Sequence, residues 1–203
     1  MNSVRLDGKE VYPSKIICIG RNYVDHIEEL NNEVPSKPVI FIKPNSSISS
    51  EIYFNPNDVI HYEGEISFLI RSGGLFGVGF GLDLTKREVQ SELKAKGLPW
   101  ERAKSFDKSA VFSEFVGFNG SVSDIRMELY INSGLAQKAD YELMLNKPNA
   151  ILSEVSSFLS FEDDDLIMTG TPKGVGVIHP GDVFCGKIFE KERLIVDSSW
   201  VVI

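Results

Sequence analysis

Cysteine is scarce in this sequence, which has only Cys18 and Cys185 among its 203 residues. Small disulfide-stabilised folds carry several cysteine pairs, so a disulfide framework is excluded and a reducing compartment is indicated. A chain of this length buries enough apolar surface to fold without such cross-links. We therefore expect a packed core, and we interpret Cys18, which lies in an apolar run, as a buried small side chain.

Long apolar runs are also missing. No stretch approaches the roughly 20 apolar residues that a membrane helix needs. The N-terminal segment MNSVRLDGKE has no apolar segment behind a basic start, so no signal peptide is predicted. These absences predict a cytoplasmic protein without a membrane partner.

The chain has fewer basic than acidic residues. The chain has 21 Lys and Arg against 29 Asp and Glu, a formal net charge of −8. A general nucleic-acid binder carries a basic stripe, and none is present, so nucleic acid is excluded as a partner. An acidic protein repels anions at long range, so an anionic substrate requires a local cation or metal ion.

Alternating βαβ units are absent as well, which argues against a doubly wound sheet. Short apolar runs rich in β-branched residues are separated by turn signals and predict strands. Helical periodicity and capping signals predict three helices. We expect a single α+β domain over residues 1–203 in which strands dominate. The strands are expected at 15–19, 39–43, 61–70, 78–82, 127–131, 166–169, 182–188 and 193–196, and the helices at 23–30, 85–96 and 149–159.

Two carboxylates recur at alternate positions of one expected strand. In segment 61–70, Glu63 and Glu65 share a face with His61 and Ser67, because side chains alternate along a strand. The opposite face is then apolar. Neighbouring carboxylates repel each other unless water or a cation intervenes, and oxygen ligands suit Mg²⁺, Mn²⁺ or Ca²⁺. The alternative is the solvent-facing side of an edge strand.

A third carboxylate, Asp83, ends the apolar strand 78–82 just before a helix. Asp is common as a helix N-cap, which is the alternative interpretation. Thr85 is expected to serve as the cap, and this frees Asp83 to bind metal. Three carboxylates leave coordination positions for water and substrate oxygens. Glu63, Glu65 and Asp83 are therefore predicted to hold a divalent cation.

A candidate acid–base pair precedes these ligands. His26 and Glu29 are three residues apart on an expected helical turn and are close enough to hydrogen-bond. A carboxylate on an imidazole fixes its tautomer and raises its basicity, so that the pair can deprotonate water. The alternative is an exposed polar turn without catalytic activity.

Two glycine-containing segments do not match nucleotide-binding motifs. Segment 77–81 lacks the G-x-G-x-x-G order, and segment 169–176 lacks the G-K-[ST] order of a phosphate loop. The hydroxyls and backbone N–H groups of 169–176 are suited to a small carboxylate. The alternative for this segment is a Pro-Gly turn.

The ordered set of motifs resembles the fumarylacetoacetate hydrolase family, and especially its short acylpyruvate hydrolase-like branch. It is also similar to 2-hydroxyhepta-2,4-diene-1,7-dioate isomerase and oxaloacetate decarboxylase members. The resemblance runs from about Lys15 to the C-terminus. It rests on the opening strand and turn (18–26), the next strand (38–44), the H-x-E-x-E strand (61–65), the D-[LMV]-T-x-R segment (82–87), a lysine segment (97–107) and the T-G-T-P loop (169–172).

The resemblance implies mixed β-sheets folded around a metal cleft, and a homodimer. It implies Mg²⁺ as the cofactor, with Mn²⁺ or Ca²⁺ as substitutes, bound by Glu63, Glu65 and Asp83. It further implies that His26 and Glu29 activate water from a lid segment and that Lys104 is catalytic. The residues expected to face the substrate are Arg21, Gln90, Lys104 and Thr171.

The implied reaction is hydrolysis of the C–C bond of an acylpyruvate, such as acetylpyruvate or a fumarylpyruvate-like acid, to pyruvate and a carboxylic acid. Tautomerisation or isomerisation, hydration, and decarboxylation of oxaloacetate use the same metal–enolate chemistry and stay open as alternatives. A more remote alternative is a non-catalytic β-rich binding domain.

Two departures from the family pattern concern the region of the ligands. Segment 71–77 is shorter than usual, and Gly64 replaces an apolar residue, which we expect to loosen the metal strand.

Overall fold

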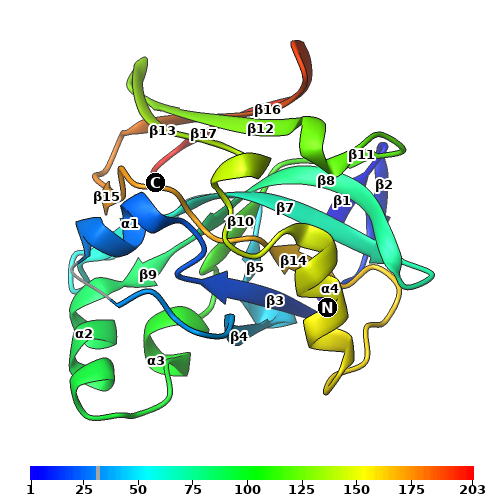
Figure 1. The fold of residues 1–203 in the computed structure, drawn as a ribbon. Helices are drawn as coiled ribbons and strands as arrows, with labels where there is room; N and C mark the ends of the chain where they lie inside the picture. Colours follow the sequence, from blue (N-terminus) through cyan, green and yellow to red (C-terminus); the bar gives the residue numbers. More distant parts are fainter. Residues whose placement is uncertain (31–32) are drawn as a thin grey trace.

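The computed structural model describes residues 1–30 and 33–203 and centres on a mixed sheet (Figure 1). The strands of this sheet run in the order β4-β3-β14-β7-β8-β10-β5, and β11 pairs with β8 beside β10. Parallel pairs (β14 with β3, β10 with β5) occur among antiparallel ones. The strands are β3 (Lys15–Gly20), β4 (Val39–Pro44), β5 (Ile48–Ser49), β7 (Gly64–Arg71), β8 (Gly74–Asp83), β10 (Ala110–Phe112), β11 (Val116–Gly117) and β14 (Leu166–Met168).

A second, antiparallel sheet covers one side of the central sheet and lies across the top of Figure 1. Its order is β13-β12-β16-β17, formed by β12 (Ile125–Ile131), β13 (Gly134–Asp140), β16 (Val183–Glu190) and β17 (Arg193–Val201). Its inward side chains, among them Met127, Phe184 and Trp200, pack with Phe80 of β8 in the largest apolar cluster. Burial of this cluster is the main stabilising contribution to the fold.

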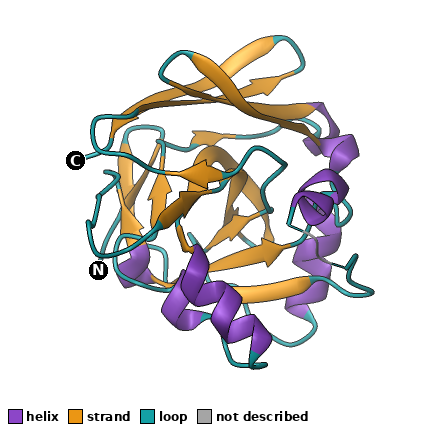
Figure 2. Cartoon of the chain, turned by 90° about the vertical axis from the view of Figure 1, so that its left-hand side faces the viewer, coloured by secondary structure: helices purple, strands orange, loops and turns teal. Residues whose placement is uncertain are grey.

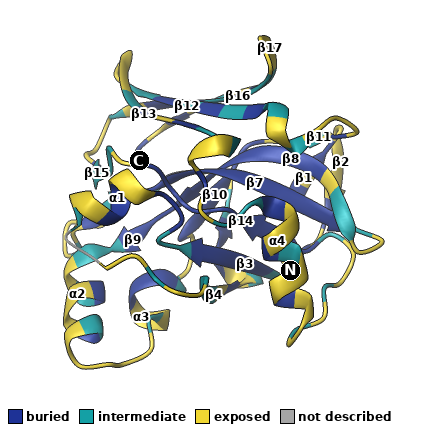
Figure 3. Ribbon diagram, viewed as in Figure 1, coloured by how far each residue is buried: buried dark blue, intermediate teal, exposed yellow. Residues whose placement is uncertain are grey.

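Two small sheets and the helices complete the domain. The sheets are the hairpin of β1 (Val4–Leu6) and β2 (Lys9–Val11), and the trio β6 (Ile60–Tyr62), β9 (Thr85–Lys86) and β15 (Gly176–Val177). The helices are α1 (Val24–Glu29), α2 (Arg87–Ala95), α3 (Glu101–Lys104) and α4 (Pro148–Ser156). They lie outside the strands (Figure 2), and their outer faces are exposed while the central strands are buried (Figure 3). None of the helices in the described residues is long and apolar enough to cross a membrane.

The predicted fold class is confirmed: the chain has a strand-dominated α+β fold with curled mixed sheets. The short segment between β7 and β8 is a hairpin turn. Arg71 pairs with Gly74, and the two connecting residues, Ser72 and Gly73, have φ values of 49° and 71°. Two consecutive left-handed residues form the turn that matches the twist of paired strands. The strands that carry Glu65 and Asp83 are thus connected directly.

The structure corrects two local expectations. Segment 61–70 is two strands, β6 and β7, that are interrupted at Glu63, and β7 is buried on both faces rather than alternating between apolar and polar sides. Lys86, not Thr85, occupies the N-cap position of helix α2, and its side chain forms no capping hydrogen bond. Thr85 lies in β9, where it pairs with His61 of β6.

The expectation that Gly64 loosens the metal strand is also wrong. A Cβ atom at Gly64 would lie 2.8 Å from Gln137 Oε1, 3.1 Å from Phe80 Cζ and 3.2 Å from Leu129 Cδ2. The second sheet therefore approaches the start of β7 so closely that no side chain fits. Glycine permits this contact, and Gln137 Oε1 accepts a hydrogen bond of 2.8 Å from the Gly64 N–H.

We predict that Gly64→Val lowers the free energy of unfolding by about 1–3 kcal/mol, because an overpacked site forces its neighbours out of their preferred positions. Urea denaturation measures the change. Gly74→Ala on the neighbouring strand is the control, since its nearest non-local atom would be 3.8 Å away, at ordinary contact distance. Equal stability of the two variants would contradict the packing argument.

Candidate metal centre and active site

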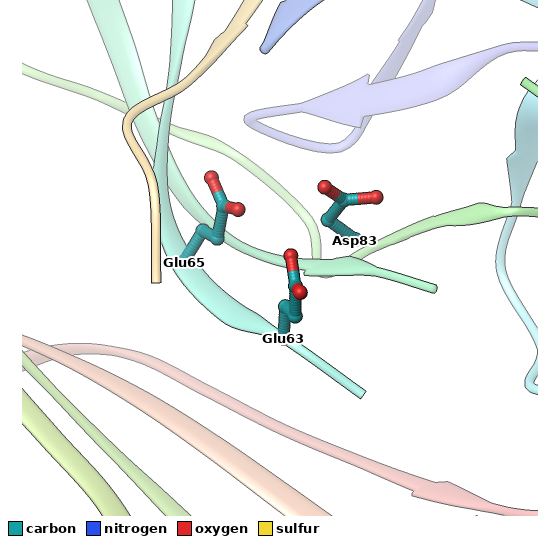
Figure 4. A group of neighbouring side chains, drawn as sticks. All are labelled: Glu63, Glu65 and Asp83. Carbon is teal, nitrogen blue, oxygen red and sulfur yellow. The ribbon is translucent and has the colours of Figure 1, made fainter. Parts of the chain in front are cut away.

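The three predicted ligands meet where β6, β7 and β8 come together. Glu63 occupies the break between β6 and β7, Glu65 is the second residue of β7, and Asp83 is the last residue of β8. The Asp83 N–H donates a 2.8 Å hydrogen bond to the Glu63 carbonyl, which fixes the two backbones side by side. One carboxylate oxygen of each residue lies within 4.8 Å of the others. Figure 4 shows the three carboxylates pointing into one space.

These carboxylates are buried, with only 5%, 1% and 1% of Glu63, Glu65 and Asp83 exposed. Charges placed so close together in a low-dielectric interior repel strongly unless cations compensate. Lys104 Nζ lies 2.7 Å from Glu63 Oε2 and 2.6 Å from Asp83 Oδ2. Arg87 pairs with the other oxygen of Glu63, and Lys43 Nζ lies 2.9 Å from Asp83 Oδ1.

Glu65 differs from its two neighbours. In the described part of the chain, no lysine or arginine forms an ion pair with Glu65, and the Gly170 N–H donates a 2.6 Å hydrogen bond to its Oε2. Burial and the nearby charges of Asp83 and Glu63 raise the pKa of Glu65 well above its ordinary value. Glu65 is thus the carboxylate that lacks a positive partner.

The pKa shifts of Glu63 and Lys104 favour their charged forms, whereas the pKa shift of Glu65 favours its neutral form. Burial alone would raise the pKa of Glu63, but Lys104 and Arg87 outweigh it and hold that pKa below its ordinary value. Burial disfavours the charged form of Lys104, yet Asp83 and Glu63 raise its pKa. Both groups are therefore charged near neutral pH.

The donor set suits a hard divalent cation. Mg²⁺ holds oxygen ligands about 2.1 Å away, so two of its ligands are at most about 4.2 Å apart. Ligand atoms within 4.8 Å of one another are close to that size. The unpaired carboxylate of Glu65 is a further reason to infer a cation at this position, since a metal ion would supply the missing positive charge.

The predicted acid–base pair lies at one wall of the same site. His26 Nδ1 is 3.1 Å from Glu29 Oε2, and Glu29 Oε1 accepts a 3.0 Å hydrogen bond from the Gly174 N–H. His26 is 6% exposed although α1 is a surface helix. The carboxylate of Glu29 favours the tautomer in which Nδ1 carries the proton, and this leaves Nε2 able to accept another.

A cavity of about 30 Å³, enough for a water molecule or an ion, is lined by His26 and by Glu63 of the carboxylate cluster. Two residues of α1, His26 and Ile27, and the aromatic side chains of Phe41 and Trp100 form part of its wall. Of the residues predicted from sequence as catalytic or substrate-facing, five line this cavity: Arg21, His26, Gln90, Lys104 and Thr171. Glu29 is not among the lining residues and contacts the cavity through His26.

Thr171 lies at the cavity with its hydroxyl already engaged. Its Oγ1 donates to the Gly64 carbonyl at 2.9 Å and accepts from Gln137 Nε2 at 2.8 Å. A hydroxyl has one proton, so Thr171 Oγ1 can present only a lone pair to a ligand in this arrangement. The predicted binding of a substrate carboxylate by this hydroxyl would need that proton to turn away from Gly64.

Several site residues were not predicted. Arg87 was within the D-L-T-K-R segment, and its spacing from Asp83 was a usable signal. Lys43 is fully buried, and its ammonium donates to the Ser109 carbonyl (3.0 Å) and hydroxyl (2.9 Å) besides pairing with Asp83. Gln137 comes from the second sheet, and no local pattern distinguishes it.

Comparison with known proteins agrees with this geometry. The family described as fumarylacetoacetate (FAA) hydrolase C-terminal matches residues 15–195. The mitochondrial oxaloacetate tautomerase oaa1 of Schizosaccharomyces pombe is 36% identical over 93% of this chain and 95% of its own length. The oxaloacetate tautomerase YcgM of Escherichia coli is 35% identical over 84% and 87%. The structure of fumarylpyruvate hydrolase from Pseudomonas aeruginosa, in complex with Mn²⁺ and pyruvate, superposes with a TM-score of 0.89 at 26% identity and covers 100% of this chain and 95% of that one.

The different environments of Glu65 and Glu63 generate a prediction for the metal-free protein. Glu65→Gln should raise its thermal midpoint at neutral pH, because the buried carboxyl of Glu65 must either carry a charge without a cation or take up a proton, and glutamine needs neither; the gain is of the order of 1–3 kcal/mol. Glu63→Gln should lower the midpoint, because it leaves Lys104 and Arg87 without a partner. Differential scanning calorimetry after chelation measures both.

The same variants test metal binding. Mg²⁺ or Mn²⁺ at about 100 times its dissociation constant should stabilise the wild-type protein by about 2.7 kcal/mol, and Glu65→Gln should lose most of this gain. A metal-dependent shift in Glu65→Gln as large as in wild type would remove Glu65 from the ligand set.

Proposed function

The chain belongs to the fumarylacetoacetate hydrolase family and is an enzyme, and on this premise we propose that it interconverts the keto and enol forms of oxaloacetate with the help of Mg²⁺. The similarity to two oxaloacetate tautomerases over most of the chain carries this proposal. It favours the tautomerase alternative over acylpyruvate hydrolysis, which the sequence motifs had placed first. The fumarylpyruvate hydrolase from Pseudomonas aeruginosa is less similar in sequence, at 26% identity.

The side chains at the cavity support the same choice. Tautomerisation moves one proton between C3 and the C2 oxygen and consumes no water. One base and one acid are enough for this step, and both His26 and Lys104 line the cavity.

His26 and Lys104 are placed for the proton transfer. We assign His26 Nε2 as the base that takes a proton from C3, with Glu29 holding the ring and stabilising its charged form. Lys104, buried and protonated between Glu63 and Asp83, is assigned as the donor to the C2 oxygen. A bound divalent cation supplies Lewis-acid stabilisation of the negative charge that develops on that oxygen.

Two contacts hold α1 over the site. The Gly174 N–H binds Glu29, and Lys173 Nζ lies 2.8 Å from Asp25 Oδ2. Both join α1 to the loop that follows Thr171. We expect these contacts to keep α1 at the cavity during proton transfer, which would protect an enolate from side reactions.

The proposed homodimer and cytoplasmic location follow from the family resemblance and from composition, and both stay predictions.

A substrate panel tests the proposed reaction. We expect Mg²⁺-dependent loss of enol-oxaloacetate absorbance at a kcat/KM at least tenfold above that for pyruvate release from acetylpyruvate, fumarylpyruvate or oxaloacetate. The reason is that the proposed roles of His26 and Lys104 complete a proton transfer within the substrate, and this reaction needs no attacking water molecule. Faster release of pyruvate from an acylpyruvate would favour the hydrolase, and faster release from oxaloacetate the decarboxylase. No turnover and no metal-dependent stabilisation would favour a non-catalytic domain.

The role of His26 can be tested separately. We expect His26→Ala to lower kcat by about 10²- to 10⁴-fold, the usual contribution of a general base, while the metal-induced thermal shift stays as in wild type. His179→Ala is the matched control, because His179 is exposed and does not line the cavity. Unchanged kcat in His26→Ala would exclude His26 as the base.

A further inference from the structure

One face of α2 is turned to the cavity. Arg87, Gln90 and Lys94 all line it, and their spacing of three and four residues places them in a row along the helix. Arg87 pairs with Glu63 and donates a 2.7 Å hydrogen bond to Gln90 Oε1. The first two residues of the row therefore belong to the metal end of the cavity. Lys94 lies one further turn away, about 5–6 Å along the axis.

Arg21 contributes a second cation to the cavity wall from the segment between β3 and α1. Its backbone has φ of 56°, a left-handed conformation that non-glycine residues rarely adopt and that is unfavourable by the order of 1 kcal/mol. Its Nε is buried and has no hydrogen-bond partner among the described residues, and its terminal NH1 makes only a long 3.5 Å contact with the Glu33 carbonyl. A strained backbone that presents an unsatisfied guanidinium to a cavity indicates a ligand at that position.

The cavity has more positive than negative side chains. Four cations line it, Arg21, Arg87, Lys94 and Lys104, whereas Glu63 is the one carboxylate among its lining residues. Arg87 and Lys104 are both engaged with that carboxylate. Burial lowers the pKa of Lys94, and the neighbouring charges of Arg21 and Arg87 lower it further. An anion bound beside Arg21 and Lys94 would reverse this effect.

We propose that Lys94 and Arg21 form a subsite for the distal carboxylate of a 2-oxo dicarboxylic acid and so select this substrate class over 2-oxo acids with a neutral tail. The inference rests on the proposed function, which places the 2-oxo acid end of the substrate at Glu63, Glu65 and Asp83. Charge-assisted hydrogen bonds from an arginine and a lysine to one carboxylate are among the stronger polar contacts in proteins. In a protein of net charge −8, they provide the local attraction that an anion requires.

Oxaloacetate and its C4 methyl ester make a direct test, because they differ only in the charge of the distal group. We expect wild-type kcat/KM to favour oxaloacetate over the ester by at least tenfold. Lys94→Gln should lower the value for oxaloacetate about tenfold and leave that for the ester within twofold, and Lys94→Arg should retain most of the preference. Arg21→Gln should shift the ratio in the same direction.

Lys96→Gln is the matched control, since Lys96 is exposed just beyond the end of α2 and pairs with Glu92 at 2.5 Å. Equal losses for both substrates in Lys94→Gln, or a wild-type enzyme indifferent to the ester, would overturn the subsite while leaving the tautomerase proposal intact. A wild-type enzyme that turns over neither compound would overturn the proposed function instead. In that case, calorimetry measures the binding of both compounds to the wild-type protein and to Lys94→Gln. Tighter binding of oxaloacetate than of the ester by wild type, with this difference lost in the variant, would support the subsite. Equal binding of the two compounds by wild type would refute it.

Discussion

The repulsion among three buried carboxylates is the constraint on which the rest of this structure depends. Glu63, Glu65 and Asp83 lie within a few ångströms of one another and are almost wholly removed from water. Such a cluster is stable only if cations compensate it. Lys104 and Arg87 do so at Glu63 and Asp83, and their own elements are placed accordingly: α3 ends at Lys104, and α2 begins at Arg87.

A second lysine, Lys43, is buried beside the same carboxylates and is itself stabilised by several hydrogen-bond acceptors. Lys43 is fully buried in β4, yet its ammonium donates to the carbonyl and the hydroxyl of Ser109 and pairs with Asp83. A buried ammonium with this many acceptors is not an unpaired charge. It joins β4 to the segment before β10 and orients Asp83 from the side opposite Lys104. The carboxylate cluster and the edge of the central sheet are therefore stabilised together.

Much of this arrangement could be predicted from sequence, and the parts that could not have a physical reason. The spacing of Glu63, Glu65 and Asp83 was informative because strand geometry and turn length act locally. The interruption of the strand at Glu63 was not predicted. In the sequence Glu63 fits the alternation of a continuous strand, and nothing in that alternation marks the residue at which the strand stops. Gly64 was misinterpreted for a related reason: its neighbour Gln137 is 73 residues away and belongs to another sheet. The alternation along a strand indicates which face is buried but not which residue of another sheet that face contacts.

Charge balance connects the metal centre to the choice of substrate. Lys43, Arg87 and Lys104 match the three carboxylates in number, although Glu65 has no cation of its own. A divalent cation beside Glu65 therefore makes this centre positive by about two charges, and the carboxylate at the 2-oxo acid end of a substrate would offset one of them. In the proposed subsite the second carboxylate would lie beside Arg21 and Lys94, which add positive charge to the same cavity. The same electrostatic requirement that holds the carboxylates together thus favours a substrate with two negative charges.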